Sequence, residues 1–93
     1  MDEALQARFS EATESIRTLS KPPSGPDLLK LYSLFKQATQ GDCQGKRPGI
    51  TEFVQRAKFD AWKAIEGTRP EEAMHTYIAF VDELLQADTQ ARS

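Results

Sequence analysis

Tyr32 and Lys36 combine an aromatic ring and a cation at helical spacing. They stand four positions apart in the stretch YSLFKQATQGD, which begins at Tyr32, and on a helix that spacing places both side chains on one face. An aromatic ring can stack on a flat ligand, and an ammonium group can donate a charge-assisted hydrogen bond to an anion. The pair therefore suits the binding of a molecule that has both features.

Positive charge is concentrated in the middle of the chain. The 93 residues carry a formal net charge of −2, whereas the segment from Lys30 to Lys63 holds seven basic and three acidic residues. Both flanking segments are net acidic. A local cationic region in an acidic chain suits a small polyanion better than nucleic acid, and the alternative is an ordinary solvated surface.

The groups that enzymes and metal sites need are not gathered in any motif. His75 is the only histidine and Cys43 the only cysteine, which is too few for the usual zinc sites and suggests no catalytic triad. The phosphate-binding motifs GxGxxG and GxxxxGK[ST] are missing. Adjacent acids such as Glu71 and Glu72 point to different sides of a helix. We therefore expect no enzymatic activity, no metal and no cofactor.

Four amphipathic helices are predicted to carry these residues. Apolar residues at helical spacing predict helices over about 3–19, 25–40, 51–67 and 69–87, and no segment has the alternation of a strand. Ser24 and Asp27 resemble a capping box at the start of the second helix. The segment 41–49, GDCQGKRPG, is a loop of a length that is often functional. The residues expected in the core include Phe53, Trp62, Ile78, Val81 and Leu85.

The fold class that follows is an all-α four-helix bundle, a single domain spanning residues 1–93. The first residues lack the features of a signal peptide, and no apolar run approaches membrane-spanning length. A single cysteine excludes an intrachain disulfide. We therefore expect a soluble, cytoplasmic monomer without stable membrane insertion.

Four segments of the chain resemble the acyl-CoA-binding protein family, also called diazepam-binding inhibitors. They are LLKLYSLFKQATQGD from Leu28, KRPG from Lys46, AKFDAWKAIEGT from Ala57 and AMHTYIAFVDEL from Ala73, in the family's order and spacing. The resemblance implies four α-helices in an up-down-down-up arrangement. It also implies one-to-one binding of medium- and long-chain acyl-CoA esters without catalysis, by an intracellular acyl-CoA carrier and pool former.

The resemblance also assigns residues to the parts of a long-chain acyl-CoA, which has a flat adenine, negative phosphates and an apolar tail. Tyr32 is expected against the adenine, with Lys36, Lys58 and Tyr77 around the ribose phosphate. The full set of expected contacts to the CoA head is Arg17, Tyr32, Phe35, Lys36, Lys58 and Tyr77. The residues expected along the acyl groove are Phe9, Thr13, Leu28, Leu29 and Ala57.

Two alternatives stay open at this point. One is a helical protein-interaction module that retains the fold but has lost the ligand. The other is the precursor of a receptor-active peptide, because the family is linked to peptides cut from the region corresponding to Gln37 to Val54. Here Val54 replaces the basic residue that would close such a peptide. Phe35 stands where the family commonly has tyrosine and Thr13 where alanine is common, departures that bear on chain-length preference and affinity rather than on the ligand class.

Overall fold

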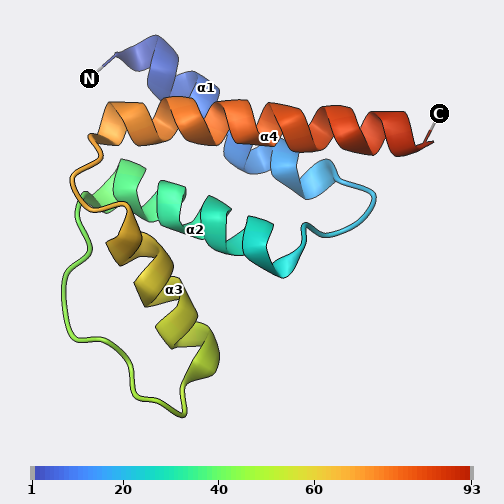
Figure 1. Ribbon diagram of the computed structural model, residues 1–93. Helices are drawn as coiled ribbons and strands as arrows, with labels where there is room; N and C mark the ends of the chain where they lie inside the picture. The colour runs from blue at the N-terminus through green and yellow to red at the C-terminus, as the bar shows by residue number, and fades with distance from the viewer. Residues whose placement is uncertain (1, 93) are drawn as a thin grey trace.

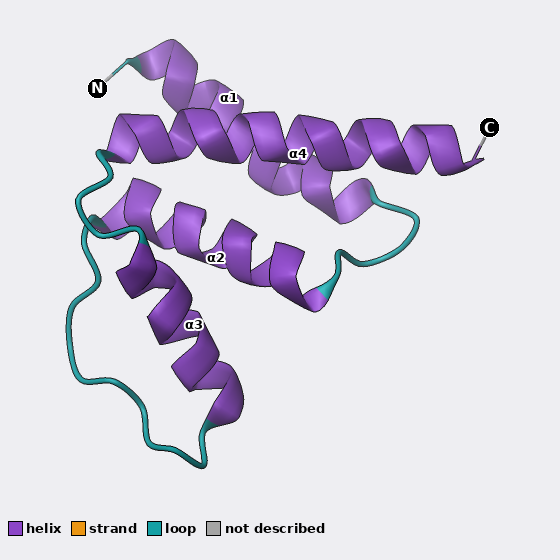
Figure 2. Ribbon diagram, viewed as in Figure 1, coloured by secondary structure: helices purple, strands orange, loops and turns teal. Residues whose placement is uncertain are grey.

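The computed structural model describes residues 2–92, which form four α-helices. α1 spans Glu3–Ser15, α2 spans Gly25–Gln40, α3 spans Phe53–Ala64 and α4 spans Pro70–Arg92, and a short 3-10 helix, η1, covers Ile16–Thr18. The described residues contain no strand (Figure 2). α1 and α4 run in one direction and α2 and α3 in the other, as Figure 1 shows. The predicted all-α bundle with up-down-down-up topology is therefore confirmed.

Local signals in the sequence set several helix ends. The Asp2 side chain accepts a hydrogen bond from the backbone N–H of Ala4 at 3.0 Å, and the Ser24 hydroxyl accepts one from Asp27 at 3.3 Å. Both bonds satisfy N–H groups that a helix start leaves without partners. α2 ends at Gln40, and its cap residue Gly41 has a φ of 81°, a conformation that glycine adopts at little cost.

The ends of the other helices differ from the prediction. α1 gives way to η1 at Ile16, and α3 ends at Ala64, before Gly67. α4 continues to Arg92, beyond its predicted end at about Ala87. Within this additional length the Asp88 carboxylate accepts hydrogen bonds from the backbone N–H of Ser20, at 3.2 Å, and from the Ser20 hydroxyl. Periodicity within one helix does not report such a partner.

The start of α3 is delayed by a turn. The backbone N–H of Glu52 donates to the Gly49 carbonyl at 3.0 Å, and the Glu52 carboxylate accepts from the Gly49 N–H at 3.0 Å. The Glu52 carbonyl then accepts the first hydrogen bond of α3, from Arg56, at 2.9 Å. α3 therefore begins at Phe53, two residues later than the apolar pattern indicates.

The hydrophobic core lies where α4 packs against both α1 and α2. Ile78, Val81 and Trp62 are buried, and Leu85 packs at the edge of the core, as the sequence predicted. The prediction for Phe53 was wrong, because its side chain is 77% exposed. Among the helices α3 contacts only α2, and Phe53 lies in its first turn, so no second helix covers it. The buried cluster comprises Leu5, Phe9, Ala12, Leu31, Leu34, Ala38, Ala73, Met74, Tyr77, Ile78, Phe80 and Val81.

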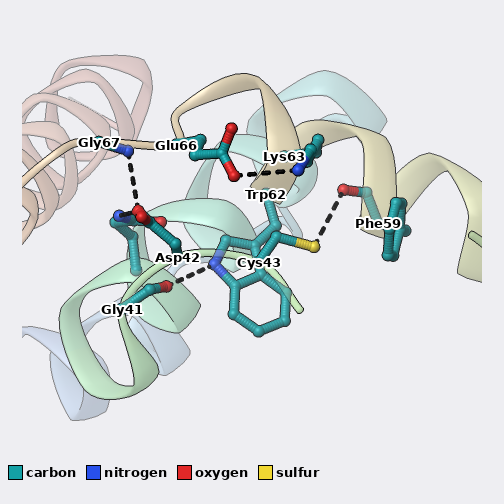
Figure 3. Close-up of polar contacts among 9 residues, drawn as sticks. Gly41, Asp42, Cys43, Phe59, Trp62, Lys63, Glu66 and Gly67 are labelled. Atoms are coloured by element: carbon teal, nitrogen blue, oxygen red, sulfur yellow. Dashed lines mark hydrogen bonds and ion pairs between the residues drawn. The ribbon is translucent and has the colours of Figure 1, made fainter. Parts of the chain in front are cut away.

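A polar junction ties the end of α2 to the turn between α3 and α4. The Gln37 side chain is fully buried, and its amide nitrogen donates to Asp42 at 2.8 Å and to the Thr68 carbonyl at 2.7 Å. The same Asp42 oxygen accepts the backbone N–H of Gly67 at 2.8 Å (Figure 3). The bond from Gly67, followed by that from Gln37, lowers the pKa of Asp42.

Trp62 adds a second link at the same place. Its indole N–H donates to the carbonyl of Gly41, the cap residue of α2, at 2.9 Å (Figure 3). This hydrogen bond links the buried ring of α3 to the end of α2. The thiol of Cys43 is buried beside it, with its sulfur 4.0 Å from the Phe59 carbonyl, and burial raises its pKa. α3 is thus anchored at its C-terminal end. No helix in the described residues is long and apolar enough to cross a bilayer.

Candidate ligand-binding site

A cleft of about 580 Å³, here called the apolar cleft, lies between α2 and α3. The two helices are joined where both end and diverge towards their first turns, as Figure 1 shows. Of the residues that line this cleft only Lys58 is charged, so the cleft is suited to a hydrocarbon chain. Its lining residues are Gly25, Pro26, Leu28, Leu29, Tyr32, Phe53, Val54, Ala57 and Lys58.

A second cleft, also of about 580 Å³ and here called the mixed cleft, adjoins the first. It is formed by residues from all four α-helices, η1 and the segment after η1, and its walls combine apolar, aromatic and basic side chains. Leu28, Tyr32 and Lys58 line both clefts and therefore mark their boundary. The residues that line the mixed cleft are Thr13, Ile16, Arg17, Pro23, Leu28, Leu31, Tyr32, Phe35, Lys58 and Tyr77.

The boundary between the clefts carries a ring and a cation from different helices. The Lys58 Nζ atom of α3 lies 5.2 Å from the centroid of the Tyr32 ring of α2, which is within the range of a cation–π interaction. Lys36, which the sequence places on one face with Tyr32, instead has its Nζ atom 5.0 Å from the Trp62 ring and lines neither cleft. The tertiary structure therefore gives Tyr32 a cationic neighbour 26 positions along the chain.

Tyr77 and Arg17 reach the mixed cleft from α4 and η1. The Tyr77 side chain is largely buried, and this burial raises the pKa of its hydroxyl, an effect that the positive charge of Arg17 opposes in part. The hydroxyl therefore stays protonated at neutral pH and can donate a hydrogen bond. Together with Lys58, these groups supply the mixed cleft with two cations and one neutral donor.

Phe9 contacts two aromatic residues that line the mixed cleft. Its ring stacks on Phe35 with centroids 5.8 Å apart and meets Tyr77 edge-on at 5.0 Å. Phe9 belongs to the buried core and lines neither cleft, although the resemblance assigned it to the acyl groove. Thr13, also assigned to that groove, lies in the mixed cleft, and its hydroxyl donates to the Ser10 carbonyl at 2.6 Å.

The other assigned residues divide between the two clefts. Leu28, Leu29 and Ala57, which the resemblance assigns to the acyl groove, line the apolar cleft. Arg17, Phe35 and Tyr77, which it assigns to the CoA head, line the mixed cleft. Sequence reasoning missed Phe53 and Val54, which line the apolar cleft near the start of α3. The apolar character of Phe53 led to its prediction as a core residue, because a residue facing a cleft has the same periodicity as one facing the core.

Among the residues that the structure describes, no carboxylate, imidazole or thiol lines either cleft. Within the part of the chain that the structure describes, no three His, Cys, Asp or Glu side chains are grouped so as to hold a metal ion. The arrangement can therefore stack, donate hydrogen bonds and exclude water.

Comparisons with known proteins match most of the chain to one family. The family model described as acyl CoA binding protein matches residues 6–81. The sequence is 46% identical over 89 residues to the acyl-CoA-binding protein of Brassica napus, covering 96% of this chain and 97% of that protein. It is also 49% identical over 82 residues to acyl-CoA-binding domain-containing protein 6 of Arabidopsis thaliana, covering 88% and 89%.

A solved structure extends the similarity to three dimensions. The crystal structure of Oryza sativa acyl-CoA-binding protein 2 superposes with a TM-score of 0.91 at 46% sequence identity, covering 96% of this chain and 99% of that one. The fold and the two clefts define a small helical ligand-binding protein. This chain belongs to the acyl-CoA-binding protein family.

Proposed function

We propose that the protein binds medium- and long-chain acyl-CoA esters one to one and carries them without catalysing a reaction on them. The observation that carries this proposal is the shared wall of the two clefts, formed by Leu28, Tyr32 and Lys58. A ligand with one apolar half and one flat, anionic half would occupy both clefts at once. Family membership and the names of the relatives support the same ligand.

The CoA head is assigned to the mixed cleft. Adenine stacks against Tyr32, and the phosphates receive hydrogen bonds from Lys58 and the Tyr77 hydroxyl, with Arg17 beside them. Lys58 already lies over the Tyr32 ring, so a small movement of its flexible side chain transfers the ammonium group from the ring to a phosphate. Lys36 contributes to the positive field from outside the clefts.

The acyl chain is assigned to the apolar cleft, along Leu28, Leu29 and Ala57. Burying methylene groups contributes about 0.8 kcal/mol each, so a long chain offers a gross gain on the order of 10 kcal/mol before the cost of association. A charge-assisted hydrogen bond adds about 1.5–3 kcal/mol. The tail therefore sets most of the affinity, and the head selects the CoA ester over the free acid.

A binder with these properties acts as a carrier and pool former. In this proposal it shields the hydrocarbon from water and releases the ligand unchanged. We assign this activity to the monomer, because both clefts are built within one chain. The cytoplasm is its proposed location.

Calorimetry tests the proposal directly. Palmitoyl-CoA is expected to bind far more tightly than CoA or palmitate, with a stoichiometry of one. Replacing Lys58 or Tyr32 by Ala should weaken palmitoyl-CoA binding about tenfold to a hundredfold, the equivalent of one lost charge-assisted contact. Lys63→Ala is the matched control, because Lys63 is also on α3 but pairs with Glu66 and lines neither cleft.

Two results would contradict the proposal. Equal affinity for palmitoyl-CoA and palmitate would mean that the mixed cleft does not recognise the CoA head. No measurable binding of either compound to the folded protein would instead favour an interaction module that has lost the ligand.

A further inference from the structure

The polar side chains that line the mixed cleft differ in what hydrogen bonds they can make. Arg17 and Lys58 carry donors and no acceptor, whereas the hydroxyls of Tyr32 and Tyr77 can donate or accept. The remaining polar side chain of this cleft is that of Thr13. The resemblance assigned Thr13 to the acyl groove, but the structure puts it in the same cleft as the two bases.

A hydrogen bond within α1 fixes the direction of the Thr13 hydroxyl proton. The hydroxyl donates to the Ser10 carbonyl, one turn earlier in the helix, at 2.6 Å. A threonine hydroxyl has one proton and two acceptor lone pairs, and this bond uses the proton. The bond is exposed to solvent, so a ligand in the cleft can reach the oxygen. Thr13 therefore offers a ligand an acceptor and no free donor.

The acceptor of Thr13 stands beside a cation. Arg17 follows Thr13 by four positions, in η1 directly after α1, and both residues line the mixed cleft. A CoA head presents a complement to each of them. Its phosphates are anions that suit the guanidinium, and its adenine amino group and the amides of its pantetheine arm carry N–H donors that suit the hydroxyl oxygen.

We propose that the Thr13 hydroxyl accepts a hydrogen bond from an N–H group of the bound CoA head and makes Thr13 a specificity-determining residue of the mixed cleft. This role rests on the proposed function and deepens it. The bases of the cleft attract any anion, including a fatty-acid carboxylate or inorganic phosphate. Neither of these anions has an N–H group, so an acceptor placed beside the bases favours the CoA head over them.

Calorimetric titration of the full-length protein with palmitoyl-CoA tests the role of Thr13. Thr13→Val keeps the branched shape of the side chain but removes the acceptor, and should weaken binding about threefold to tenfold. Thr13→Ser keeps the hydroxyl and should bind like the wild type. Thr18→Val is the matched control, because the Thr18 hydroxyl donates in the same way to the Ser15 carbonyl, at 2.7 Å, but Thr18 lines neither cleft. This control should leave binding unchanged.

Changes in the ligand identify the donor. The ethenoadenine analogue of palmitoyl-CoA lacks the adenine N–H group. If Thr13→Val no longer weakens binding of this analogue, the donor is the adenine amino group, and an undiminished effect assigns the donor to the pantetheine arm. With either donor, the effect of Thr13→Val should be the same for octanoyl-CoA as for palmitoyl-CoA. It should also persist when salt is added, because the contact involves no charge on the protein.

Three results would overturn the role of Thr13 and leave the proposed function standing. The first is equal affinity of Thr13→Val and the wild type for palmitoyl-CoA. The second is binding by Thr13→Ser that is as weak as that of Thr13→Val. The third is an effect that grows with the length of the acyl chain, which would return Thr13 to the acyl groove. A wild-type protein that does not bind palmitoyl-CoA would instead overturn the proposed function, and the role of Thr13 with it.

Discussion

α3 and α4 differ in how many helices they pack against. α4 lies between α1 and α2 and contributes Ala73, Met74, Tyr77, Ile78, Phe80 and Val81 to the buried core. α3 contacts only α2 among the helices, and Trp62 is its only buried residue. α4 therefore supplies much of the buried core, whereas α3 supplies one wall of the apolar cleft. The helix with few packing partners is the one that leaves apolar surface open for a ligand.

The polar junction connects these two regions. Gln37, Asp42 and Gly67 join the end of α2 to the turn that precedes α4, and Trp62 fastens α3 to the same place. Because both helices are held where they end, their first turns can stand apart and form the apolar cleft. The cleft therefore depends on a polar cluster at its closed end.

The largest expected effect comes from removing a phenylalanine of the buried core, on α1, and it contrasts with the removal of a phenylalanine of α3. Phe9→Ala removes a buried ring that contacts Phe35 and Tyr77, and should lower the free energy of unfolding by about 3–5 kcal/mol. Phe53→Ala, at an exposed position of α3, should change it by less than about 0.5 kcal/mol. Urea denaturation followed by circular dichroism measures both. If Phe9→Ala weakens palmitoyl-CoA binding but leaves unfolding unchanged, Phe9 is a groove residue rather than a core residue.

A smaller effect is expected at the anchor of α3. Trp62→Phe keeps a buried ring but removes the indole N–H that donates to the Gly41 carbonyl. The lost hydrogen bond should cost about 1–3 kcal/mol of unfolding free energy. Circular dichroism is the suitable probe, because Trp62 is the only tryptophan and the variant has no tryptophan fluorescence. Unchanged stability would mean that the Gln37 and Asp42 contacts hold α3 alone.

The junction should also make stability depend on acid pH. Hydrogen bonds from Gly67 and Gln37 lower the pKa of Asp42 in the folded protein. A lowered folded-state pKa contributes stability that is complete above the unfolded value of about 3.9 and is lost as pH falls through the folded-state value. Asp42→Asn keeps an acceptor oxygen without the charge, so this variant should lose less stability than the wild type below about pH 4. Urea titrations across this pH range measure the difference, and parallel curves would contradict the role of Asp42.

The smallest effect is expected in the loop before α3. Arg47 and Asp60 form a bidentate ion pair between the loop and α3, but both side chains are about half exposed. Solvent screens such pairs, and they contribute little to stability. Arg47→Ala should therefore give a urea curve close to that of the wild type. A large loss would show that the loop is a rigid support of α3, and Asp60→Ala should then have the same effect.

Much of the fold was predictable from local features of the sequence. The Ser24 cap, Pro26 and Gly41 set the bounds of α2, which were predicted as they occur. The start of α3 and the end of α4 were not predicted correctly. The Gly49–Glu52 turn precedes α3, and the contact between Ser20 and Asp88 lies in the last part of α4. Such contacts involve side chains whose partners lie outside the helix.

Local sequence patterns are enough to predict four amphipathic helices, a basic middle segment and the aromatic and basic residues that resemble a known family. Which side chains from different helices come into contact depends on the tertiary structure. It brought Tyr32 to Lys58 rather than to Lys36, put Phe9 in the core and left Phe53 at the edge of a cleft. The reason is physical: helical periodicity specifies which side chains share a face, whereas which faces touch and which stay open depends on the packing of the helices.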